Sequence, residues 1–144
     1  MTSPICVDAS VVIRLVTGSA DAEVVRERFA RWIATGRPLV APALFAFEVA
    51  NGLYRYAVAG ALTDGQAQEA LAAALALGIE LEPLPSRHAR ALDIARRLEL
   101  PATYDAHYLA TAEARGATLY TFDARLEGWA KALGVACERG AAAT

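Results

Sequence analysis

Two different spacings of apolar residues run along this chain of 144 residues. Short apolar runs bounded by turn-forming residues are typical of buried strands, and longer stretches repeat their apolar residues at helical spacing. The pattern predicts strands at 5–7, 39–42, 79–84, 117–123 and 135–138. It predicts helices at 10–16, 21–32, 43–59, 63–77, 86–98, 104–114 and 126–133.

Strands therefore alternate with helical segments along the chain, although strict alternation breaks where two helices follow one another, as between residues 43 and 77. Alternation of this kind predicts a parallel sheet with helices on both faces. We find no internal repeat and no low-complexity linker, so we expect a single domain over residues 1–144. In such sheets, ligands bind outside the carboxyl ends of the strands.

The composition is apolar, with 56% hydrophobic residues and a mean hydropathy of +0.29. Such a chain has a large core or an apolar face that meets a partner. No uncharged apolar run reaches the roughly 18 residues of a membrane span, and no signal-type segment begins the chain, so we expect a cytoplasmic protein. We interpret Cys6 and Cys137 as small buried residues in a reducing compartment.

The charge balance excludes a general polycation, because the formal net charge is −2 and the pI is about 5.7. Lys131 is the only lysine among the 14 basic residues, and the others are arginines. A GC-rich genome is the simplest explanation of this bias. Arginine nevertheless binds phosphate well through its planar fork of donors.

Four acidic residues stand where the predicted elements meet. Asp8 follows the first strand and Asp123 ends the fourth, while Asp105 lies in the first turn of a predicted helix. Glu48 lies one or two turns into the helix that leaves the strand at 39–42. Each acid alone has an ordinary explanation as a helix cap, a first-turn acid or an exposed side chain. Together they are expected at one edge of the sheet.

Clustered carboxylates repel one another, and burial penalises each charge further, so the cluster predicts a bound cation. Oxygen ligands suit Mg²⁺, with Mn²⁺ as a substitute. We expect Asp8 and Asp105 to bind the metal directly, and Glu48 and Asp123 directly or through water. Such an ion activates water against a phosphodiester, so the expected reaction is hydrolysis of an RNA strand with all four acids as catalytic residues.

At these residues the sequence resembles the PIN-domain ribonucleases, and in particular the VapC toxins of bacterial toxin–antitoxin pairs. Three segments carry the likeness in order: "VDASVVIRLV", "FEVANGLYR" and "TYDAHYLATAEARGATLYTFD". The resemblance makes Ser10, Asn51 and Thr121 supporting polar residues of the site. It implies a PIN-like three-layer fold, with a short, mostly parallel central sheet flanked by helices on both faces.

The resemblance also implies an activity and partners. Similar proteins are Mg²⁺-dependent endoribonucleases that cut tRNA, rRNA or mRNA and slow growth. A cognate antitoxin protein, usually encoded beside them, buries their site. They commonly form homodimers, which would suit the apolar composition. A non-toxin PIN nuclease of RNA processing is the nearest alternative.

Several other residues are weaker candidates. Arg14 and Arg55 are placed to reach substrate phosphate, although an exposed or partner-facing role suits Arg55 equally well. We interpret the two histidines as surface or core residues and the segment with Arg87, Arg90, Arg96 and Arg97 as a solvated helix face. Aromatic residues able to stack on bases are interpreted as core or interface: Trp32, Phe45, Phe47, Tyr54 and Tyr56.

Two further classes of function remain open. A phosphoryl-transfer module also begins with an aspartate after the first strand, but the phosphatases of that type need an Asp-x-Asp pair, and here the second position is Ser10. A catalytically silent module that binds RNA or a protein partner would not need the complete set of acids.

Overall fold

A computed structural model describes residues 3–140 of the chain as five strands and seven helices. The expected domain, residues 1–144, includes residues 1–2 and 141–144, which lie outside the described part. The strands are β1 (Ile5–Val7), β2 (Leu39–Pro42), β3 (Glu80–Glu82), β4 (Thr118–Thr121) and β5 (Cys137–Arg139). The helices are α1 (Ala9–Val16), α2 (Ala22–Ala34), α3 (Leu44–Val58), α4 (Asp64–Leu75), α5 (Pro85–Leu98), α6 (Tyr104–Arg115) and α7 (Ala124–Leu133).

The sheet has the order β3-β2-β1-β4-β5, and all four strand pairs are parallel. The chain moves outward from β1 through β2 to β3, and β4 then pairs on the other side of β1 with Val7 opposite Tyr120. The strand order therefore reverses at β1. A crevice at the carboxyl end of such a switch point is the usual ligand site of a parallel sheet.

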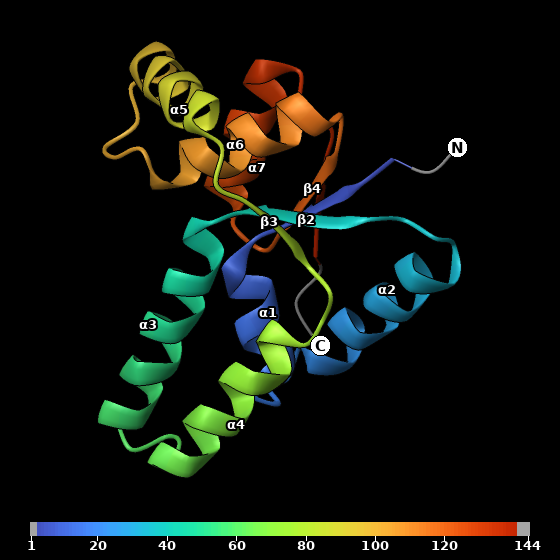
Figure 1. Ribbon diagram of the computed structural model, residues 1–144, viewed down its shortest axis with the longest axis vertical. Coiled ribbons are helices and arrows are strands. Elements are labelled where there is room, and N and C mark those ends of the chain that lie inside the picture. Colours follow the sequence, from blue (N-terminus) through green and yellow to red (C-terminus); the bar gives the residue numbers. More distant parts are fainter. Residues whose placement is uncertain (1–2, 141–144) are drawn as a thin grey trace.

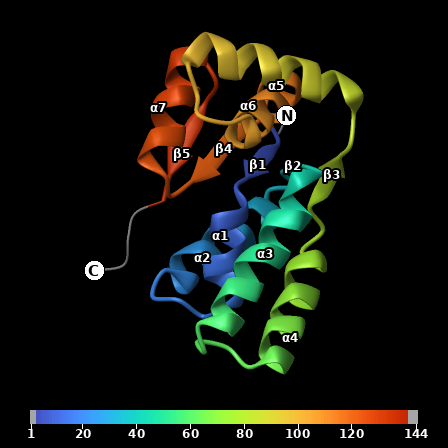
Figure 2. The same cartoon turned by 90° about the vertical axis from the view of Figure 1, so that its left-hand side faces the viewer.

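The helices form two outer layers around the sheet. Helices α1 to α4 lie on one side and α5 to α7 on the other, in both views (Figure 1, Figure 2). Helix α6 contacts β1, β2 and β4, and its sheet-facing side includes the buried alanines Ala106 and Ala110. Small residues at these positions let the helix approach the sheet closely. The structure confirms the predicted three-layer α/β fold.

The ends of several elements differ from the predicted ones for local reasons. Helices α1 and α7 begin earlier than predicted because Asp8 and Asp123 cap them and accept hydrogen bonds from backbone amides. Strand β3 is shorter than 79–84; it lies at the edge of the sheet, and Pro83 has no N–H to donate. The remaining strands and helices overlap the predicted ranges.

The residues expected to be buried or at an interface differ in their exposure. Trp32, Phe45 and Cys6 are buried, whereas Cys137 is only partly buried, which corrects the expectation for that residue. The remaining aromatic residues of α3 (Phe47, Tyr54 and Tyr56) are exposed, which excludes the core and leaves an interface as their expected role. None of the helices in the described part of the chain is long and apolar enough to cross a bilayer.

Candidate active site

Asp8 lies at the carboxyl end of the central strand, where β1 turns into α1. Its Oδ1 accepts a hydrogen bond from the amide of Ser10 at 3.4 Å. Its Oδ2 accepts two more, from the hydroxyls of Ser10 at 2.9 Å and Thr121 at 2.8 Å. The carboxylate is thus held in place by α1 and by β4 together.

Thr121 joins two of the acids. It is fully buried, and while its hydroxyl donates to Asp8 it accepts a hydrogen bond from the amide of Asp123 at 3.0 Å. Asp123 in turn caps α7 and accepts from the amide of Arg125 at 2.8 Å. The predicted supporting residues Ser10 and Thr121 therefore both contact Asp8.

Glu48 approaches the site from α3. The buried hydroxyl of Tyr108 on α6 donates a 2.6 Å hydrogen bond to its Oε1. Burial is the largest influence on the pKa of Glu48 and raises it; the Tyr108 hydrogen bond acts in the opposite direction, and the charges of Asp8 and Asp105 raise it further. Burial also raises the pKa of Tyr108, which keeps its phenol protonated as a donor.

Asp105 lies in the first turn of α6. Burial, followed by the negative charges of Asp8 and Asp123, raises the pKa of its carboxyl group, and the charge of Arg125 lowers it less. The structure thus brings all four acids within electrostatic reach, since Asp8 acts on both Glu48 and Asp105, and Asp105 acts on Glu48. Their convergence at one edge of the sheet agrees with the sequence prediction.

The acids do not form a closed cage. Among residues 3–140, no three His, Cys, Asp or Glu side chains are arranged to hold one metal ion. Instead, Glu48 bonds to Tyr108 and Asp8 to Ser10 and Thr121, as expected when mutually repelling carboxylates find separate partners. This donor set still fits Mg²⁺, which usually keeps several waters and binds through only one or two carboxylates and substrate phosphate.

The other predicted site residues are either paired elsewhere in the protein or exposed. Arg14 pairs with Asp21 at 3.2 Å, and its guanidinium lies 4.4 Å from the centre of the Phe122 ring. Asn51 and Arg55 are exposed on α3. Arg14 is therefore engaged within the protein, and no contact joins it to the four acids.

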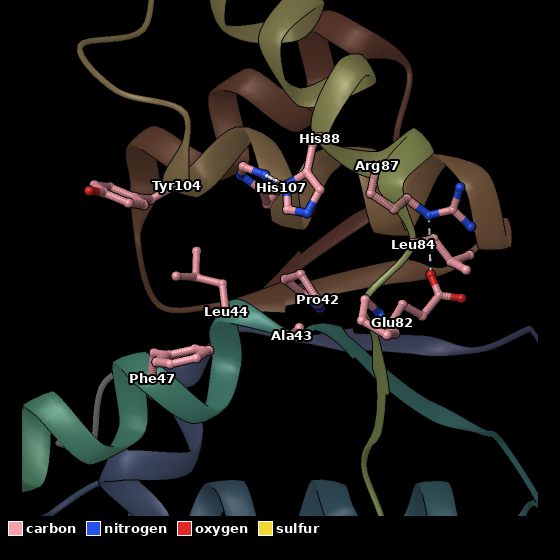
Figure 3. A pocket seen from close by; sticks show the side chains of 11 residues that line it. Pro42, Ala43, Leu44, Phe47, Glu82, Leu84, Arg87, His88, Tyr104 and His107 are labelled. Carbon is pink, nitrogen blue, oxygen red and sulfur yellow. Dashed lines mark hydrogen bonds and ion pairs between the residues drawn. The ribbon is translucent and has the colours of Figure 1, made fainter.

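Two features of the site region were missed from the sequence. The first is Tyr108, which follows Asp105 by three positions and so lies on a neighbouring part of the same helix face. The second is a cavity beside the acids that contains a histidine pair: Nδ1 of His88 lies 2.9 Å from Nε2 of His107 (Figure 3). Helical spacing could have indicated Tyr108, but nothing in the sequence pairs the two histidines.

The fold and the acids together define a parallel α/β domain with an acidic site at the switch point of its sheet. The model of the PIN domain family matches residues 5–132. The chain therefore belongs to the PIN domain family, which confirms the family predicted from the sequence. PIN domains are generally nucleases that depend on divalent metal ions, so membership supports a phosphodiester hydrolase.

Solved structures with the same fold cover nearly the whole chain. VapBC2 from Rickettsia felis, bound to a DNA fragment from its promoter, matches with a TM-score of 0.73 and 13% identity over 94% of this chain and 97% of that one. PAE2754 from Pyrobaculum aerophilum matches with a TM-score of 0.68 and 26% identity, over 90% and 87%. A domain of a functionally unknown protein from Methanocaldococcus jannaschii gives 0.57 and 19%, over 99% and 94%. No curated protein matches the sequence.

Proposed function

We propose that this protein is a Mg²⁺-dependent endoribonuclease that acts as the toxin of a toxin–antitoxin pair. The observation that carries the proposal is the convergence of Asp8, Glu48, Asp105 and Asp123 at the switch point of a PIN-family sheet. Asp8 and Asp105 would hold the ion directly, and Glu48 and Asp123 directly or through water. Bound there, Mg²⁺ would polarise the scissile phosphodiester and lower the pKa of a water molecule.

The protein supplies the positioning for this chemistry. Ser10 and Thr121 fix both oxygens of the Asp8 carboxylate, and Tyr108 fixes one oxygen of Glu48. Because these bonds exist before any substrate binds, the carboxylates need little reorganisation when the charged phosphate arrives. Asn51 and Arg55 are exposed on α3 and follow Glu48 by about one and two helical turns. They are available to contact the RNA strand or a protein partner.

Two observations support protein partners. The exposed side of α3 carries Tyr54 and Val58, which are 66% and 69% exposed and lie four residues apart on one helix face. Exposed apolar patches of this kind mark protein interaction sites. VapBC2 from Rickettsia felis, which shares the fold, was solved bound to a DNA fragment from its promoter. We therefore propose an antitoxin partner and a homodimer for this chain.

Inducible expression in bacterial cells, with mapping of new RNA 5′ ends, tests the proposal. The wild type should arrest growth and generate new ends, and the Asp8→Asn variant should do neither although it folds. Asp93→Asn, which alters an exposed carboxylate on α5, is the matched control and should behave like the wild type. Equal cutting by wild type and Asp8→Asn would contradict the role of the acids.

Assays with the purified protein test the metal dependence separately from the toxin role. EDTA should abolish RNA cleavage, and added Mg²⁺ or Mn²⁺ should restore it. Full activity in EDTA would exclude the metal mechanism. RNA cleavage without growth arrest would instead identify a PIN nuclease of RNA processing and would exclude the toxin role.

A further inference from the structure

A cavity of about 370 Å³ lies beside the acids, and the proposed catalytic roles leave it unused. We call it the side cavity. It opens to solvent and is lined by the end of β2, the loop after β3 and the first turns of α3, α5 and α6. Its volume lies near the lower end of the roughly 300–1,000 Å³ of pockets that enclose small organic ligands. The residues used below are Pro42, Leu44, Phe47, His88, Tyr104 and His107.

Two walls of the side cavity continue into the acidic site. Leu44 lies four residues before Glu48 on α3, and Tyr104 lies four residues before Tyr108 on α6. Side chains four residues apart share one face of a helix, separated by about one 5.4 Å turn. Since Glu48 and Tyr108 are hydrogen-bonded to each other, the cavity and the acids are neighbours along both helices.

Two aromatic rings lie at one end of the cavity. Phe47 and Tyr104 are 74% and 61% exposed although both line the cavity, and Figure 3 shows them on the same side of it, away from the Glu82–Arg87 ion pair. Exposed aromatic faces stack on nucleobases with little dependence on sequence. Phe47 directly precedes Glu48 and Tyr104 directly precedes Asp105, so each ring is adjacent in the chain to an acid of the site.

The histidine pair provides a polar group above the middle of the cavity. Nδ1 of His107 faces the carbonyl oxygen of Thr103 at 2.7 Å and so carries a proton. Nε2 of the neutral His107 ring then accepts the hydrogen bond from Nδ1 of His88. In the neutral pair, Nε2 of His88 is left as an acceptor, and Figure 3 shows the His88 ring extending from α5 toward Pro42.

We propose that the side cavity binds one unpaired nucleobase of the RNA, next to the phosphate held at the four acids. The base stacks on Tyr104 or Phe47, and an N–H on its edge donates to His88. The inference rests on the proposed ribonuclease function and adds to it a binding site for one base beside the bond that is cut. The volume suits one base better than a protein helix, and apolar walls, flat rings and one acceptor are what a base requires.

The test uses the purified protein with Mg²⁺ and a fluorescently labelled single-stranded RNA that carries the mapped cut site. Single abasic nucleotides are placed at each position around the cut, and kcat/KM is measured for each RNA. We expect one abasic position adjacent to the cut to lower kcat/KM about 5- to 160-fold, the range of a lost base–aromatic stack.

Protein variants then assign the loss to the cavity. Tyr104→Leu and Phe47→Leu keep apolar bulk and remove the rings, and Tyr56→Leu removes an exposed ring elsewhere on α3 as the control. For at least one cavity variant, kcat/KM with intact RNA should be as low as that of the wild type with the abasic RNA. The abasic nucleotide should not lower kcat/KM of that variant further. Tyr56→Leu should show the wild-type pattern.

The outcomes separate this proposal from the function on which it rests. If wild-type protein cuts no RNA with Mg²⁺ or Mn²⁺, the ribonuclease proposal fails, and the base site fails with it. If it cuts RNA but no abasic position matters, or Tyr104→Leu and Phe47→Leu cut normally, only the base site is overturned. It is also overturned if these variants change the mass in sedimentation, since a second copy then covers the cavity.

Discussion

Replacing Thr121 by valine tests whether one buried hydroxyl holds two of the acids in place. Valine keeps the shape of threonine but can make neither the 2.8 Å bond to Asp8 nor the 3.0 Å bond from the amide of Asp123. A hydrogen bond to a charged group contributes about 1.5–3 kcal/mol, and an amide left without a partner costs about 1–3 kcal/mol. Asp8 and the amide of Asp123 are only partly buried, so water can replace part of these two hydrogen bonds in the variant. We therefore expect the free energy of unfolding to fall by about 2–4 kcal/mol.

The matched control is Thr111→Val on α6. Thr111 is also fully buried, but its hydroxyl has no hydrogen-bond partner within residues 3–140. Valine there removes an unsatisfied polar group, so stability should stay the same or increase.

Urea unfolding in EDTA measures the free energy of unfolding of both variants. An unchanged m-value checks that only stability has altered. The expected loss for Thr121→Val corresponds to a fall in Tm of roughly 2–4 °C per kcal/mol. RNA cleavage should also weaken, because Asp8 loses a positioning bond. Equal stability of Thr121→Val and Thr111→Val would refute the proposed link between β4 and the acids.

Two further predictions concern the acids and the glycines. The pKa of Glu48 and Asp105 is higher in the folded than in the unfolded state, so the fold loses stability as pH rises from the ordinary carboxyl range through the raised values. Glu48→Gln and Asp105→Asn should therefore unfold at higher temperature than the wild type at pH 7 without metal, while losing activity; an unchanged or lower Tm at pH 7 would contradict the sign. A Cβ at Gly128 within α7 has no neighbour within 4 Å, so Gly128→Ala should stabilise the fold by about 0.5–1 kcal/mol. A Cβ at Gly140 would lie 2.5 Å from the Phe122 ring, so Gly140→Ala should destabilise the fold by about 1 kcal/mol or more. Chemical denaturation of the two alanine variants checks this order, and a Gly140→Ala variant as stable as Gly128→Ala would contradict the close packing of Gly140 against Phe122.

Local chain patterns were sufficient to predict the edge of the sheet where the acids gather. Asp8 and Asp123 each follow a short apolar strand and cap the next helix, and both signals are contained in a few neighbouring residues. Parallel pairing then places both at one edge without any knowledge of side-chain packing. The same reasoning located Asp105 at a helix start.

Contacts that depend on how distant elements pack were beyond prediction. Arg14 pairs with Asp21 and lies over Phe122 because α1, α2 and β4 meet there, so its expected role at the phosphate receives no support. His88 and His107 meet only because α5 packs against α6. The sequence also predicts which acids converge but not their rotamers, which are set by local partners such as Tyr108.

The central position of β1 has a consequence for when the acidic site can form during synthesis of the chain. Thr121, which donates to Asp8 from β4, lies 113 positions later in the chain. During synthesis, β1 leaves the ribosome long before its neighbour β4, and in the meantime Asp8 has only its local bonds to Ser10. If the protein cuts RNA, a partly made chain is harmless to the ribosome that is translating it, and the activity arises only when the last parallel strands have joined the sheet.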